Sequence, residues 1–158
     1  AVADEAERVR RQRRLRIQSL RLALEHDARL ADLVLPGIAA RLGIALVPLA
    51  MDSEGVRPES ILQVHRATPL SGLYLQPTLQ NPLGASMSET KKQALYDLLV
   101  EHQVPLIEDD VYAELHYGPQ PPKPVKSFDD EGLVMHCGSF SKSLGYDKTQ
   151  VTRHPWFH

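Results

Sequence analysis

VPLIEDDVYAEL, residues 104–115, places a short apolar run directly before a group of acidic side chains. A run of this kind, bounded by polar residues, predicts a buried strand over 104–107. In an open α/β sheet, ligands bind outside the carboxyl ends of the strands. The polar residues that this strand would deliver to such an end are Glu108, Asp109, Asp110 and Tyr112.

Strand-like and helix-like segments alternate on either side of this stretch. Apolar runs predict further strands at 44–49, 72–75 (GLYL) and 133–137. Helices are expected at 36–42, where Gly43 would end the helix, and at 58–64. Because strands that alternate with helices form parallel βαβ units, the sequence predicts an α/β fold with a mostly parallel sheet.

A third predicted helix begins after Ser88 and has the clearest pattern. Ser88 is a favourable N-cap residue for the amides that follow it. Lys91 and Lys92 are expected on the solvent side of this helix. The apolar residues at helical spacing are Ala94, Leu95, Leu98 and Leu99.

The two ends of the chain differ in composition from the part between them. Residues 1–34 are rich in arginine and predict a solvated helical segment. Residues 145–158 show no helix or strand pattern and are expected to form an irregular tail. The Pro-rich stretch 118–126 predicts an extended loop, because proline cannot donate to a strand ladder. The remaining segment, 35–144, is the predicted domain.

Composition excludes several classes of protein. The 158 residues are 42% hydrophobic and 24% charged, which fits one globular domain. A formal charge of −2 gives no bulk attraction to nucleic acid, and a single cysteine excludes an internal disulfide and a cysteine-cluster metal site. No apolar run approaches the roughly 20 residues of a membrane span. A cytoplasmic protein without membrane or metal sites is expected.

Three predicted strand ends carry polar groups that could meet in one crevice. They are Asn81, the pair Asp109 and Tyr112, and residues 139–142. Each group alone has an ordinary alternative, since an Asn-Pro pair is usually a turn, a strand-end aspartate is often a cap, and SFSK fits a surface loop. The order and chemistry of all three together favour a binding site.

The text of these segments resembles a known family. PTLQNPLGASMS (77–88), LIEDDVYAEL (106–115) and CGSFSKSLG (137–145) are similar to segments of the fold-type I, class I and II aminotransferases that use pyridoxal 5'-phosphate (PLP). The similarity is strongest to the aminotransferase-like domain of MocR-type GntR-family regulators and covers about 35–144. It implies a three-layer α/β/α sandwich, of which this chain would be the incomplete central part.

The resemblance also implies a role for each matching residue. Lys142 would hold PLP as an internal aldimine and act as the catalytic residue. Asp109 would face the pyridine nitrogen and keep the ring protonated. The remaining cofactor-binding residues implied are Asn81 and Tyr112 at the phenolic oxygen, and Ser139 at the phosphate.

Neighbouring residues receive weaker assignments. Ser141 could be a second phosphate contact or a turn residue. Glu108 and Asp110 are expected to be solvated or structural. His136 and Cys137 point to opposite faces of one strand, so that core packing is a better interpretation than a joint metal site.

Some family features have no counterpart here. Leu35 stands where the family has an aromatic that stacks on the ring, and Arg153 is not at the spacing of its phosphate-binding arginine. The substrate-binding small domain and the glycine-rich phosphate turn are absent from these 158 residues. We therefore expect a fragment with little turnover by itself.

Three functions remain open. The first is amino-group transfer on an amino acid or amine in the parent family, by a homodimer. The second is effector sensing in a PLP-dependent transcriptional regulator, where DNA would be bound only through a separate N-terminal domain. The third is an inactive, truncated remnant.

Overall fold

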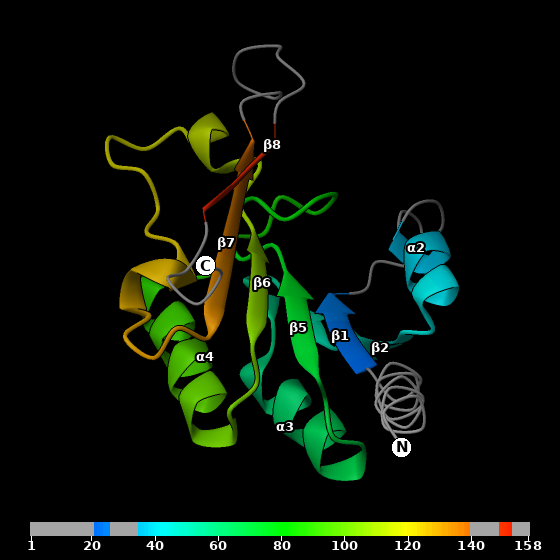
Figure 1. The fold of residues 1–158 in the computed structure, drawn as a ribbon. Helices are drawn as coiled ribbons and strands as arrows, with labels where there is room; N and C mark the ends of the chain where they lie inside the picture. The colour runs from blue at the N-terminus through cyan, green and yellow to red at the C-terminus, as the bar shows by residue number, and fades with distance from the viewer. Residues whose placement is uncertain (1–20, 26–34, 140–148, 153–158) are drawn as a thin grey trace, which may run out of the picture.

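A six-stranded sheet forms the centre of the computed structural model, which describes residues 21–25, 35–139 and 149–152 (Figure 1). The strand order is β2-β1-β5-β6-β7-β8. All neighbouring pairs are parallel except β7 and β8, which are antiparallel. The mostly parallel α/β sheet is therefore confirmed. Its strands are β1 Arg21–Glu25, β2 Ala45–Leu49, β5 Gly72–Leu75, β6 Leu106–Asp109, β7 Val134–Ser139 and β8 Thr149–Thr152.

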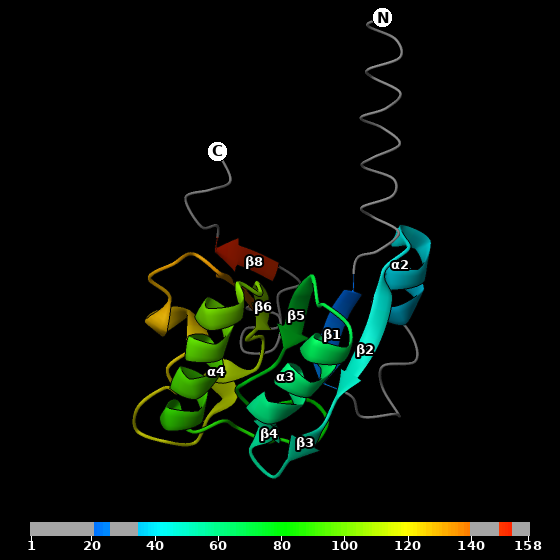
Figure 2. The same ribbon diagram turned by 90° about the horizontal axis from the view of Figure 1, so that it is seen from below.

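Helices cover one face of this sheet. Figure 2 shows α3 (Pro58–Ala67) and α4 (Glu89–His102) side by side on that face, with α2 (Leu35–Leu42) beside β2. Within the described ranges, no helix has the length and apolar character needed to cross a membrane. The shorter elements are the hairpin of β3 (Met51–Asp52) and β4 (Gly55–Val56) and the 3-10 helices η1 (Ala113–Leu115) and η2 (Val125–Phe128).

A single apolar core lies between the sheet and these helices. Side chains of β5, β6 and β7 pack there against α3, α4 and η2. Because buried aliphatic side chains contribute most of the stabilisation of such a domain, this core holds the strand ends in place. Its fully buried members include Ile61, Leu73, Leu75, Leu95, Leu99, Val104, Leu106, Val125 and Val134.

Two helix ends lie where the sequence predicted them, after α2 and before α4. Gly43 adopts φ +69°, a left-handed conformation that favours glycine, directly after α2. Ser88 caps α4, because its Oγ accepts a hydrogen bond from the Lys91 amide at 3.4 Å. Both predictions are confirmed, and the other predicted elements between 35 and 139 are present with ends shifted by a few residues.

The helix expected over 1–34 is wrong for Arg21–Glu25. These residues form β1, which lies inside the sheet between β2 and β5, and Ala23 is fully buried. The short apolar run in RLALE, bounded by Arg21 and Glu25, fits a strand inside a parallel sheet, and parallel pairing on both sides stabilises it. The irregular tail expected over 145–158 is likewise wrong for Thr149–Thr152, which form β8 and pair with β7. The other residues of 1–34 and of 145–158 lie outside the described residues.

Candidate functional site

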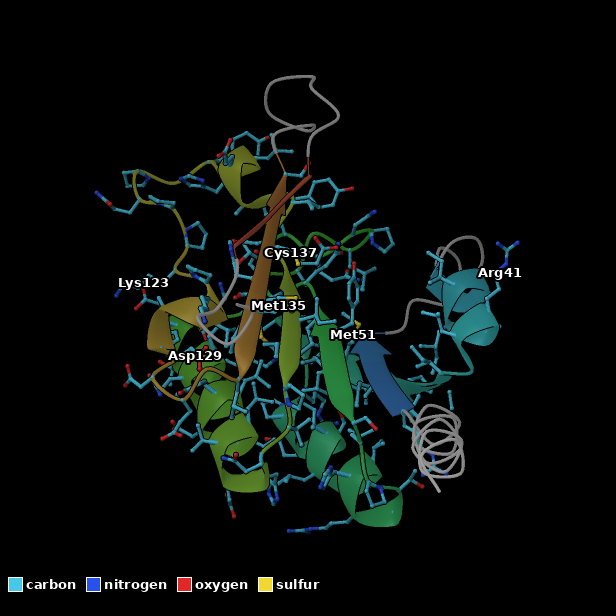
Figure 3. The ribbon with its side chains drawn as sticks, in the orientation of Figure 1. Arg41, Met51, Lys123, Asp129, Met135 and Cys137 are labelled. Atoms are coloured by element: carbon cyan, nitrogen blue, oxygen red, sulfur yellow. The ribbon has the colours of Figure 1, made fainter. Side chains whose placement is uncertain are left out.

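The carboxyl ends of β5, β6 and β7 lie at one end of the sheet (Figure 1). Leu75 on β5 is in register with Glu108 on β6, and Asp109 is in register with Cys137 on β7. The Asp110 amide continues this alignment by donating to the Cys137 carbonyl at 2.7 Å. Figure 3 shows Cys137 further along β7 than Met135, toward this end. The polar residues that follow these strands therefore share one edge.

Asp109 has two carboxylate oxygens in different surroundings. Oδ2 accepts hydrogen bonds from the Tyr74 hydroxyl and from Gln76 Nε2, the latter at 3.0 Å. Oδ1 is buried and has no hydrogen-bond partner among the described residues. A buried acceptor without a donor is costly, so Oδ1 is suited to a ligand that brings a charged N–H group.

Asn81 lies in the loop 76–87, called the asparagine loop here. Backbone bonds fold this loop on itself, including Gln80 N to Ala85 O at 2.8 Å. Gln76 Oε1 accepts from the Asn81 amide at 3.0 Å, and Asn81 Nδ2 donates to the Tyr112 hydroxyl at 3.4 Å. The loop thus brings the Asn81 side chain to Tyr112 and holds the Asn81 backbone against Gln76, the first loop residue after β5.

Ser139 is the last residue of β7 and is half-buried at the same edge. Register with β6 sets it two positions beyond Cys137, the partner of Asp109. Lys142 and Ser141 lie outside the described residues. The structure thus places Asn81, Asp109, Tyr112 and Ser139 at one edge, and the assignment of Lys142 stays a prediction from its sequence motif.

The opposite face of β6 carries two buried acids. Glu108 is 0% exposed and accepts from the amides of Val125 and Lys126 at 2.7 and 2.9 Å, where η2 begins. Burial raises the pKa of Glu108, although these two hydrogen bonds favour its charged form. Of the two earlier possibilities for Glu108, the structural one is correct. The loop expected over 118–126 likewise gives way to η2 at Val125.

Asp110 pairs with His136 on this face. The Asp110 Oδ2 and His136 Nε2 atoms are 3.0 Å apart, and both side chains are largely covered. This hydrogen bond raises the pKa of His136, while burial lowers it. His136 therefore takes part in an ion pair and does not serve only as core packing.

The prediction that Lys92 faces solvent is wrong. Its side chain is 1% exposed, and Nζ donates to Thr78 Oγ1 and to the Lys123 carbonyl, both at 2.7 Å. Burial lowers the pKa of Lys92, against the attraction of Glu108. The Lys92 side chain thus joins α4 to the asparagine loop and to the Pro-rich segment.

Two side chains of this site were missed by the sequence analysis. Tyr74 was included only as a member of the apolar GLYL strand, and Gln76, the residue after that strand, was given no role. The position of Gln76 just past the end of β5 was a usable signal, since ligand-facing groups follow parallel strands. Nothing local distinguished Tyr74 from a core residue.

The free energy of unfolding is expected to fall as the pH rises above 6.5. The raised pKa of His136 means that the folded chain holds this proton more tightly than the unfolded chain. The stabilisation is fully present below the ordinary value of 6.5 and is lost as the pH passes the folded pKa. Glu108 acts with the same sign from 4.5 upward, because its pKa is also raised.

Urea unfolding between about pH 5 and pH 8 measures this dependence. Lys126 disfavours the His136 charge, and the lowered pKa of Lys92 acts with the opposite sign, because it makes the free energy of unfolding rise as the pH approaches 10.5. At about pH 6, His136→Gln is expected to remove about 1 kcal/mol after allowance for solvent screening, and to flatten the slope. His102→Gln, beside the exposed Glu101, is the control. Equal slopes in both variants would contradict the assignment.

Comparison with known proteins gives matches to aminotransferases and to transcriptional regulators. The family model described as aminotransferase class I and II matches residues 63–147, just over half of the chain. The uncharacterized HTH-type transcriptional regulator YisV of Bacillus subtilis is 36% identical over 102 residues, which cover 65% of this chain and 21% of that protein. The aromatic-amino-acid aminotransferase 1 of Thermococcus litoralis is 34% identical over 103 residues, which cover 62% of this chain and 25% of that protein.

Solved structures resemble the fold over a longer part of the chain. LysN, an α-aminoadipate aminotransferase from Thermus thermophilus solved with N-(5'-phosphopyridoxyl)-L-leucine, matches with a TM-score of 0.75 and 26% identity over 87% of this chain and 36% of that one. A multiple substrate aminotransferase from Thermococcus profundus matches with a TM-score of 0.71 and 29% identity, over 87% of this chain and 35% of that one. The chain thus spans about a fifth to a third of the proteins it matches.

Proposed function

This chain belongs to the aminotransferase class I and II family, and from that premise we propose that it binds PLP at the carboxyl ends of β5, β6 and β7. One observation carries the proposal. The buried Asp109 Oδ1 lacks a donor among the described residues, and Gln76 links Asp109 to Asn81, whose side chain contacts Tyr112. A protonated pyridine nitrogen and a phenolate oxygen on one ring match these two features.

The proposed PLP site assigns one contact of the cofactor to each of its polar residues. Asp109 Oδ1 accepts from the ring N–H, and its negative charge keeps that proton in place. Asn81 Nδ2 and the Tyr112 hydroxyl donate to the phenolic oxygen, and Ser139 donates to the phosphate. When bound, PLP supplies an electron sink for negative charge at the substrate carbon.

Lys142 completes the proposed site as the covalent attachment point and proton carrier. Its amine has to lose a proton before it can act as a nucleophile, and a bound cationic ring beside it would favour the neutral form. The sequence GSFSKS around it carries this part of the proposal. The same amine then moves a proton at the substrate carbon.

The hydroxyl of Tyr112 provides the first test. Tyr112→Phe is expected to raise the dissociation constant for PLP about 3- to 10-fold, because the loss of one hydrogen bond is about 1 kcal/mol. Titration of PLP absorbance against the purified chain measures this constant. Tyr117→Phe is the matched control, since Tyr117 is 105% exposed. Equal constants for the two variants would rule out a Tyr112 contact.

A second candidate function is effector sensing in a transcriptional regulator. YisV, and YdcR of Escherichia coli at 39% identity over 105 residues, are both described as HTH-type transcriptional regulators. For this function, ligand binding at the PLP site would change the DNA affinity of a DNA-binding domain in the parent protein. The parent would be a cytoplasmic homodimer whose ligand is an amino acid or amine.

The genomic reading frame separates the two candidates. A winged-helix coding region in frame and upstream of Ala1 would favour the regulator. DNA affinity of that parent protein should then change when PLP and an amine are added. A parent without such a region that transfers amino groups would instead favour the enzyme.

A further inference from the structure

Asp109 is held from one side by two residues of β5 and its following loop. The Tyr74 hydroxyl and Gln76 Nε2 both donate to Oδ2, and neither hydrogen bond involves Oδ1. We infer that Tyr74 and Gln76 are positioning residues that turn the Asp109 carboxylate so that Oδ1 faces the ring nitrogen of PLP. The inference rests on the proposed function and adds two residues to it.

The backbone register explains why these side chains meet. Tyr74 on β5 is directly opposite Ile107 on β6, so the two side chains lie on the same face of the sheet. Residues two apart in a strand also share a face, which places Asp109 with Ile107. Glu108 falls on the other face, where it is buried against η2. Only Asp109 among these acids is therefore within reach of Tyr74.

Two donors on one oxygen define the plane of a carboxylate. The terminal torsion of aspartate is broad, so an unrestrained carboxylate exposes either oxygen at many angles. With Oδ2 engaged twice, the lone pairs of Oδ1 are left for a ligand. A group already held in its binding orientation loses less conformational freedom when the ligand arrives.

Gln76, the first residue of the asparagine loop, also connects Asp109 to Asn81. Its Nε2 donates to Asp109 Oδ2, and its Oε1 accepts from the Asn81 amide at 3.0 Å. These partners fix which end of the amide carries the oxygen, because a carboxylate only accepts and a backbone N–H only donates. One side chain thus sets the relative position of two proposed PLP contacts.

The test compares Tyr74→Phe and Gln76→Met with Tyr96→Phe. Tyr96 is a matched control because its buried hydroxyl accepts from the Asp130 and Glu131 amides, remote from Asp109. All three variants lose a tyrosine or glutamine hydrogen bond, and thermal unfolding measures the resulting loss of stability. PLP titration and the ¹⁵N chemical shift of isotopically labelled ring nitrogen measure the effect on the site.

Tyr74→Phe and Gln76→Met are each expected to raise the PLP dissociation constant about 3- to 10-fold, and to move the ring-nitrogen shift toward the unprotonated form. Tyr96→Phe should lower the unfolding temperature without changing either readout. If the wild-type chain binds PLP and all three variants keep its constant and shift, the positioning inference is wrong and the proposed function stands. If the wild-type chain binds no PLP, both are wrong.

Discussion

Asp109→Ala is expected to raise the dissociation constant for PLP at least about tenfold, because a hydrogen bond to a charged group contributes about 1.5–3 kcal/mol and 1.4 kcal/mol is tenfold in affinity. The substitution removes both the orphaned Oδ1 and the oxygen held by Tyr74 and Gln76. Absorbance titration of PLP at constant ionic strength measures the change.

Two further variants separate the effect of the Asp109 charge from that of its size, and from the effect of removing any acidic side chain. Asp109→Asn keeps the size of the side chain but loses its charge, so its constant should fall between those of wild type and Asp109→Ala. Asp97→Ala removes an exposed acid of α4 whose partner is Gln93. An Asp109→Ala constant equal to that of Asp97→Ala would show that Asp109 does not contact the cofactor.

The sequence was sufficient to predict that the polar residues after β6 and β7 share one edge of the sheet. The apolar runs before Asp109 and before Ser139 are short and bounded by polar residues, so each strand and its carboxyl end could be predicted. Parallel pairing then brings those ends together. The same arrangement brings Asn81 next to Tyr112, with Nδ2 3.4 Å from the hydroxyl oxygen.

Long-range contacts explain what the sequence did not predict. Arg21–Glu25 is a strand because β2 and β5 pair with it on both sides, and an arginine-rich neighbourhood conceals that pairing. Helical spacing did offer a signal for Lys92. The buried side chains of Leu95, Tyr96 and Leu99 lie three, four and seven residues after it, on the same face of α4.

A buried lysine needs acceptors, and those of Lys92 are remote in sequence. Thr78 belongs to the asparagine loop, and the Lys123 carbonyl belongs to the Pro-rich segment. The same segment supplies the two amides that cover Glu108. Neither partner set can be derived from helix periodicity, because each depends on how a loop crosses the helical face.

Reductive labelling of Lys142 tests the central claim most directly. The chain is mixed with PLP, treated with borohydride, digested and analysed by mass spectrometry to locate the modified lysine. The account predicts modification at Lys142, lost in Lys142→Ala and retained in Lys123→Ala, since Lys123 is an exposed partner of Glu89. Equal modification of Lys142, Lys91 and Lys123, or unchanged total labelling in Lys142→Ala, would contradict it.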